Sequence, residues 1–147
     1  MKKIVQILLA CCMVFTLIVV PVSAAEVRPE SSVTIIELSD NITIEISTST
    51  YSNSRVNSKV GHKTYTIKDS GREIGSATLF AYFEYNGSTA WVTDTDYTYS
   101  TVNGCTYSHG GITTSGNRAS MSGTFYYGGA SYPFSISLTC SGSGTIS

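Results

Sequence analysis

The chain has 147 residues and a mass of 15.7 kDa, and charged side chains make up only 13% of it. This length accommodates one domain and is too short for a TIM barrel or a two-domain enzyme. Nine basic and ten acidic side chains give a net charge of −1. This balance excludes a strongly basic nucleic-acid-binding protein, because counterion release from nucleic acid needs clustered Lys and Arg.

The first 24 residues have the layout of a secretory signal peptide. Two lysines precede an apolar run over residues 4–20, and Pro21 with small residues up to Ala24 follows that run. The alternatives are a retained membrane anchor and a lipidated Cys11. No cluster of stop-transfer charges follows the run, and the run continues well past Cys11, so cleavage after Ala24 or Ala25 is the favoured interpretation.

Cleavage there predicts a secreted protein, extracellular or associated with the cell surface, with no stable membrane insertion once the leader is removed. Residues 25–31 hold charges, a proline and serines, and are expected to be a flexible segment. The remaining residues, 32–147, are expected to form a single domain.

Removal of the leader leaves two cysteines, Cys105 and Cys140, and a net charge near −3. Two cysteines in an exported chain most simply pair with each other. The bond would close a loop of 36 residues, which contributes roughly 4 kcal/mol in the chain-entropy account. A reactive or metal-bound thiol is the alternative, but neither cysteine has a CxxC partner or a histidine at metal-ligand spacing. The sequence therefore predicts a Cys105–Cys140 disulfide.

Period-two alternation dominates the mature chain, and no stretch has the periodicity of a helix. The expected strands cover residues 33–38, 42–46, 64–67, 73–85, 89–99, 119–127 and 132–140. The polar stretch over 47–58 is expected to be a loop. Asn86-Gly87 predicts a two-residue hairpin, because both central residues of such a turn need positive φ. Pro133 places the start of the last strand toward a sheet edge.

Six to eight short strands separated by regular turns favour an all-β fold, namely a two-sheet antiparallel sandwich of immunoglobulin-like architecture. A small β-barrel is the alternative. The chain is not expected to be a true immunoglobulin domain. Trp91 precedes Cys105 instead of lying between the two cysteines, and the interval between the cysteines is short.

Residues suited to catalysis are few. His62 and His109 lie in polar stretches without a nucleophile motif. Asp94 and Asp96 form a D-x-D pair on one strand face, a candidate for a calcium site or, with Glu84 on the preceding strand, for a glycoside-hydrolase dyad. The rest of a calcium loop is missing, which favours a role in keeping a sheet edge hydrated. We therefore expect no catalytic residues, no metal and no cofactor.

The C-terminal third of the chain is almost uncharged. From Thr98 to Ser147 the single charged side chain is Arg118, and Ser, Thr, Gly and Tyr are abundant. This composition is similar to that of an antibody paratope, because tyrosines offer broad contact at low entropic cost. The alternative is that Tyr and Thr are simply good strand formers. The candidate contact residues, whose rings can stack on sugars or fill a groove in a protein, are Trp91, Tyr97, Tyr99, Tyr107, Tyr126 and Tyr127.

Four parts of the chain are typical of one group of proteins: the leader, residues 63–67, residues 81–90 and residues 138–141. Together they resemble small secreted proteins of Gram-positive bacteria that have no assigned activity. The resemblance implies an extracellular domain like a β-sandwich, and it supplies no catalytic residues.

These features predict a secreted, non-catalytic module that binds a partner or coats a surface. The expected partner is an extracellular glycan, an envelope component or a host protein, and not a nucleic acid. A secreted bacteriocin-like antagonist fits the same length, export and disulfide. A small hydrolase that uses Asp94, Asp96 or Glu84 is the third possibility.

Overall fold

The computed structural model describes residues 31–52, 57–102 and 104–147. The predicted signal peptide lies outside these residues, as does the expected flexible segment apart from Ser31, which already belongs to the first strand. The described residues form strands and turns, and they contain no helix. The all-β prediction is therefore confirmed.

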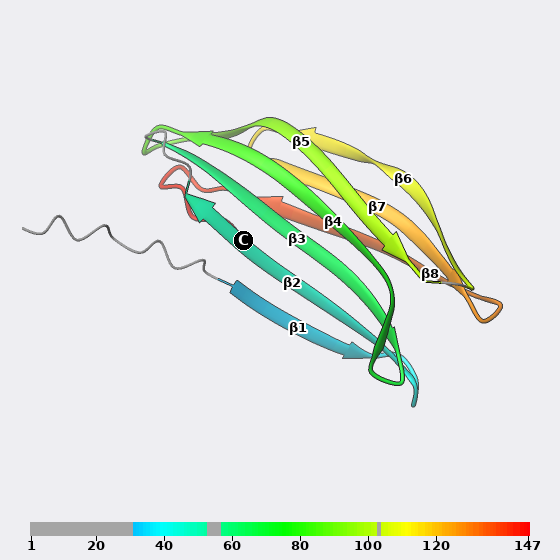
Figure 1. Cartoon of the computed structure of the whole chain (residues 1–147). Helices are drawn as coiled ribbons and strands as arrows, with labels where there is room; N and C mark the ends of the chain where they lie inside the picture. The colour runs from blue at the N-terminus through cyan, green and yellow to red at the C-terminus, as the bar shows by residue number, and fades with distance from the viewer. Residues whose placement is uncertain (1–30, 53–56, 103) are drawn as a thin grey trace, which may run out of the picture.

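Eight antiparallel strands form two sheets (Figure 1). In chain order they are β1 (Ser31–Glu37), β2 (Ile42–Ser52), β3 (Ser58–Asp69), β4 (Arg72–Tyr85), β5 (Ala90–Thr101), β6 (Cys105–Ser115), β7 (Arg118–Tyr127) and β8 (Ala130–Thr139). One sheet has the order β1-β2-β3-β4-β5 and the other the order β6-β7-β8. The sheets pack face to face without closing into a barrel, so the domain is a two-sheet sandwich. Within each sheet every described strand pairs with the next one in the chain, without the Greek-key order of an immunoglobulin domain.

The core lies between the sheets, and period-two alternation selects the residues that enter it. On β4, Leu79, Ala81 and Phe83 are buried, whereas the alternate residues face away from the core. The three-stranded sheet contributes Phe125 and Leu138, both fully buried. β8 lies at the edge of that sheet, as Pro133 predicts.

The prediction of a loop over residues 47–58 is wrong for most of that stretch. β2 continues to Ser52 and β3 begins at Ser58, with Ser47 paired to Thr64 and Ser52 paired to Lys59. Residues 53–56 lie outside the described residues. The stretch is polar because its side chains are exposed or half-buried, and threonine is itself a good strand former.

The turn at Asn86-Gly87 also differs from the predicted two-residue hairpin. Tyr85 pairs with Ala90, so four residues connect the strands, and Gly87 alone among them has positive φ. The Asn86 side-chain oxygen accepts hydrogen bonds from the backbone N–H groups of Ser88 and Thr89, at 3.0 and 2.9 Å. This side-chain cap stabilises the longer loop and replaces the second positive-φ residue.

The predicted Cys105–Cys140 disulfide is wrong. Cys105 pairs with Tyr127 at one end of β7, whereas Cys140 follows Thr139, the partner of Arg118 at the other end. The nine residue steps along β7 correspond to about 30 Å, and a disulfide needs Cα atoms within about 7 Å. The reason is topological: the start of the first strand and the end of the third in an antiparallel meander lie at opposite ends of the sheet.

Both cysteines are free and buried. Burial raises the pKa of each thiol, which disfavours the reactive thiolate. We expect a thiol reagent to find no reactive group in native protein that begins at residue 25, and two groups per chain after unfolding without a reductant. We also expect the same melting temperature with and without reductant. Fewer than two thiols in the unfolded chain would contradict this structure.

Candidate functional site

Four of the six predicted contact residues project between the sheets: Tyr97, Tyr99, Tyr107 and Tyr127. Tyr97 and Tyr99 lie directly opposite Leu79 and Ala77, both of which are fully buried. Directly opposed residues share a sheet face. These side chains therefore belong to the inner face of the sandwich, although β5 is an edge strand and the Tyr99 side chain remains 57% exposed.

The inner tyrosines join the two sheets where β5 meets β6. The Tyr97 ring stacks on His109 with a centroid distance of 4.0 Å and an interplanar angle of 2°. Tyr99 contacts Tyr107 at 4.8 Å, and the Tyr107 hydroxyl lies 3.1 Å from His109 Nδ1. Burial, followed by the neighbouring Tyr97 and Tyr99, raises the pKa of Tyr107. This cluster closes one side of the sandwich.

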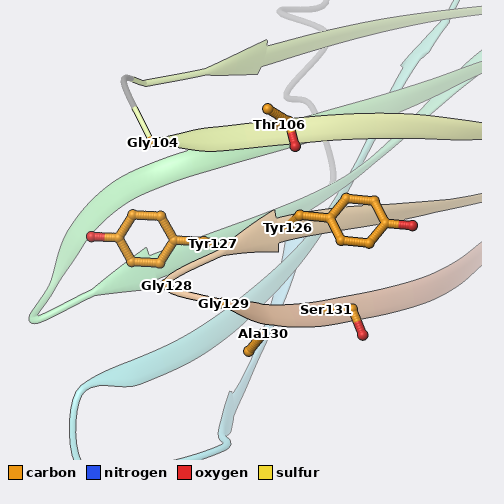
Figure 2. Close-up of a pocket in the computed structure, with 8 residues that line it drawn as sticks. All are labelled: Gly104, Thr106, Tyr126, Tyr127, Gly128, Gly129, Ala130 and Ser131. Carbon is orange, nitrogen blue, oxygen red and sulfur yellow. The ribbon is translucent and has the colours of Figure 1, made fainter.

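Tyr126 and Tyr127 lie at the β7–β8 hairpin, beside a hollow of about 460 Å³ (Figure 2). Figure 2 shows the two rings pointing in opposite directions. The Tyr127 hydroxyl donates a 2.9 Å hydrogen bond to Asp69 Oδ2, which raises the pKa of Tyr127 and ties the hairpin to the end of β3. The hollow is lined mainly by glycines and small side chains, so it offers a single exposed ring, that of Tyr126.

Trp91 lies on the outer face of the five-stranded sheet, which also carries aromatic side chains from three other strands. We call this group the aromatic platform; its members are Tyr51, His62, Phe80, Tyr82 and Trp91. The Tyr51 and His62 rings are 4.8 Å apart, and the His62 and Phe80 rings are 4.6 Å apart. Burial lowers the pKa of His62, which favours its neutral form.

The strand register explains how the aromatic platform forms. His62 on β3 pairs with Phe80 on β4, and Val60 pairs with both Tyr51 on β2 and Tyr82 on β4. Trp91 on β5 pairs with Glu84, the next outward residue after Tyr82. The rings of Tyr51, His62 and Phe80 are therefore in contact, and Tyr82 and Trp91 lie on the same outer face of β4 and β5. Tyr51, Tyr82 and Trp91 are 46%, 37% and 39% exposed.

Acidic side chains border the aromatic platform on the β5 side. Asp94 pairs with Tyr82 and Asp96 with Phe80, so both carboxylates lie on the outer face beside the rings. Each carboxylate also accepts a hydrogen bond from the next backbone N–H, Asp94 from Thr95 at 2.8 Å and Asp96 from Tyr97 at 2.7 Å. A shallow hollow of about 170 Å³ lies here, partly lined by Tyr82 and Asp94.

The described residues contain no group of three His, Cys, Asp or Glu side chains that could hold a metal ion. Asp94 and Asp96 lie on successive outward positions of one strand, and the acid opposite Trp91, Glu84, lies on the neighbouring strand. Their partners are backbone amides and aromatic neighbours, an environment that suits hydrogen bonding to a neutral polar ligand.

Trp91 is the one member of the aromatic platform among the contact residues that the sequence predicts. Phe80 and Tyr82 alternate with the buried face of β4, so the same alternation that identified the core also places them outward. Folding the chain about the turn after Asp69 brings His62 opposite Phe80. Tyr51 carries no such signal, because the polar composition of residues 47–58 predicts a loop where the structure has the end of β2.

Comparisons with protein-family models, with curated proteins and with solved structures give no match for this chain. Within the described ranges, no helix has the length and apolar character needed to cross a membrane. The structure thus defines the class of the protein as an antiparallel β-sandwich that displays an aromatic platform on the outer face of its larger sheet.

Proposed function

We propose that the protein is a secreted, non-catalytic module that binds glycans through the aromatic platform. Export is supported by the leader in the sequence, with its two lysines, apolar run and small residues before Ala25. Binding is supported by a single observation on the structure: aromatic rings from four strands gather on a solvent-facing sheet surface, outside the core.

The surface is chemically complementary to a sugar. Flat rings can cover the apolar C–H face of a pyranose, and side chains such as Trp and Tyr combine this apolar contact with a polar group. The carboxylates of Asp94, Asp96 and Glu84 border the rings and can accept hydrogen bonds from sugar hydroxyls. The shallow hollow beside Tyr82 leaves room for a substituent that projects from an extended chain.

The proposal favours binding over hydrolysis for a geometric reason. A glycosidase holds its two carboxylates on opposite sides of the scissile bond. Here Asp94 and Asp96 project from the same face of β5, each bonded to the amide that follows it. Glu84 lies on the same outer face of the neighbouring strand, so all three carboxylates approach a glycan from one side.

We expect Trp91→Ala and Tyr82→Ala to weaken glycan binding about 10- to 100-fold without a change in melting temperature, because both side chains are partly exposed. The probes are a glycan array, chitin beads and purified bacterial peptidoglycan, followed by titration with the best ligand. Tyr126→Ala is the matched control, since Tyr126 is also an exposed tyrosine but belongs to the other sheet. Failure of the unmodified protein to bind any probe, or an equal loss in Tyr126→Ala, would contradict the proposal.

A further inference from the structure

The two open sheets have four free edge strands among the described residues: β1, β5, β6 and β8. A free edge presents unpaired backbone groups that can pair with another chain, and proteins usually block this pairing. β5 is blocked by its own side chains, because the carboxylates of Asp94 and Asp96 accept the N–H groups of Thr95 and Tyr97. The aspartates thus protect this edge, in line with the sequence interpretation.

β6 and β8 are protected by other means. The β6–β7 register shifts between His109 and Gly111, and such a bulge interrupts regular pairing along the strand. β8 contains Pro133, which has no backbone N–H to donate to a neighbouring strand. Each of these three edges therefore carries a feature that opposes the addition of a further strand.

β1 has no such protection. Its seven residues are exposed, they contain no proline, lysine or bulge, and they pair with β2 in an unbroken register. β1 packs against β2 alone among the described strands and lies at the free edge in Figure 1. Its apolar side chains are unusually open for a folded domain, with Val33 58% and Ile35 64% exposed on the outer face and Ile36 44% exposed on the inner face.

The inner side of this edge is also unfilled. The three-stranded sheet ends at β8, and an apolar groove of about 370 Å³ remains between β8 and the overhanging β1 and β2. Ile36, Ile44 and Ile46 line one wall and Phe134 lies on the other. Edge and groove together form a surface that burial against another chain would stabilise.

We propose that β1 pairs antiparallel with β1 of a second copy of this chain, which merges the two five-stranded sheets into one ten-stranded sheet. A two-fold axis at Thr34 aligns all seven residues of each strand. It places Val33 opposite Ile35 of the partner subunit on the outer face, twice by symmetry. On the outer face, the residues that flank the axis are therefore apolar in both strands.

Charge selects this register over its neighbour. With the axis at Thr34, Glu37, the only charged residue of β1, lies opposite Ser31 of the partner subunit. An axis at Ile35 would instead place Glu37 opposite the apolar Val33 of the partner subunit. The isologous pairing also closes on itself, which leaves the protected edges β5 and β6 at the outside of the dimer.

The dimer is tested by sedimentation velocity over a range of concentrations. We expect the unmodified protein to sediment as a dimer and Ile35→Lys to sediment as a monomer with the same melting temperature, because Ile35 is exposed in the single chain. Thr98→Lys is the matched control: it adds the same charge to an exposed position on β5 and should leave the dimer intact. A monomeric unmodified protein, a dimer that survives Ile35→Lys, or an open-ended assembly would each overturn the proposal.

Cysteine cross-linking tests the register. In the proposed pairing the two Thr34 residues face each other with Cα atoms about 4.5–5.5 Å apart, which suits a disulfide. Thr34→Cys should therefore form a covalent dimer under mild oxidation. Ser32→Cys should not, because four residue steps, about 13 Å, separate the two copies of residue 32. Equal cross-linking of both variants would contradict the register.

This inference is independent of the glycan proposal, since β1 contributes no residue to the aromatic platform. Ile35→Lys should abolish the dimer while a single chain keeps its glycan affinity, and Tyr82→Ala should do the reverse. The merged sheet would carry two platforms on one continuous face, so binding to a polymeric glycan should be tighter for the dimer than for the Ile35→Lys monomer.

Discussion

Phe125→Ala should lower the free energy of unfolding by about 3–5 kcal/mol, because it removes a fully buried aromatic ring from the centre of the sandwich. The Phe125 ring lies 4.9 Å from that of Tyr107, 5.7 Å from that of Phe134 and 6.2 Å from that of Tyr65. These neighbours come from both sheets. The cavity left by the ring would therefore lie between the two sheets. Neither sheet could fill it unless a strand moved away from the neighbours to which it is hydrogen-bonded.

The measurement is urea unfolding followed by the fluorescence of Trp91, the single tryptophan of the chain. Tyr126→Ala serves as the control, because Tyr126 is the next residue on β7 and points to the opposite, exposed face. A surface change of this kind should alter the free energy of unfolding by no more than about 0.5 kcal/mol. A loss under 1 kcal/mol for Phe125→Ala would mean that the two sheets do not share this core.

The layered fold could be predicted from the sequence because alternation is a local signal. The stretch around Leu79, Ala81 and Phe83 indicates one buried face, and Phe134, Ile136 and Leu138 indicate another; all six are buried. Glycine-rich turns give similarly local information. Ser70 and Gly71, and likewise Gly128 and Gly129, have positive φ at two-residue hairpins.

The failed disulfide shows what a local signal lacks. A disulfide predicted from the number of cysteines assumes that the chain between Cys105 and Cys140 is a flexible loop. That stretch folds instead as three strands. The number of reversals decides whether two residues meet. An odd number of antiparallel strands between them carries the second residue to the far end of the sheet, and no pairwise spacing rule contains this information.

The aromatic platform depends on pairing between strands, which is why the sequence revealed only Trp91. Its members come from β2, β3, β4 and β5, and each strand supplies one or two outward rings. The tyrosines that stood out by composition are instead divided among other surfaces. Tyr97 and Tyr107 serve to join the sheets, and Tyr127 binds Asp69. Composition identifies aromatic side chains that are suited to binding, but it does not show on which face of the sheet they lie.

Gly123→Ala should destabilise the protein by about 1–3 kcal/mol, although alanine is the smallest side chain that can be added. A Cβ atom at this position would lie 2.6 Å from Tyr107 Cε2, 2.8 Å from the Tyr107 hydroxyl and 3.0 Å from Phe134 Cε1. Gly123 pairs with His109 and Phe134 on the inner face, and the Tyr107 ring crosses directly over it. The Tyr107 ring thus occupies the space that a side chain at position 123 would need.

The Tyr107 ring cannot move aside at low cost. The Tyr99 ring contacts it at 4.8 Å and the Phe125 ring at 4.9 Å, while its hydroxyl lies 3.1 Å from His109 Nδ1. Added volume at Gly123 should therefore be transmitted to the contacts that join β5 to β6. Urea unfolding measures the loss in the free energy of unfolding.

A double-mutant cycle with Tyr107→Leu tests the cause. Tyr107→Leu alone should be destabilising, because it removes ring contacts with both sheets. Gly123→Ala should cost less in that background than in the unmodified chain, because the overlapping ring atoms are gone. The expected coupling is about 0.5–3 kcal/mol. Strictly additive losses would show that alanine at position 123 acts through the backbone and not through the tyrosine that closes this side of the sandwich.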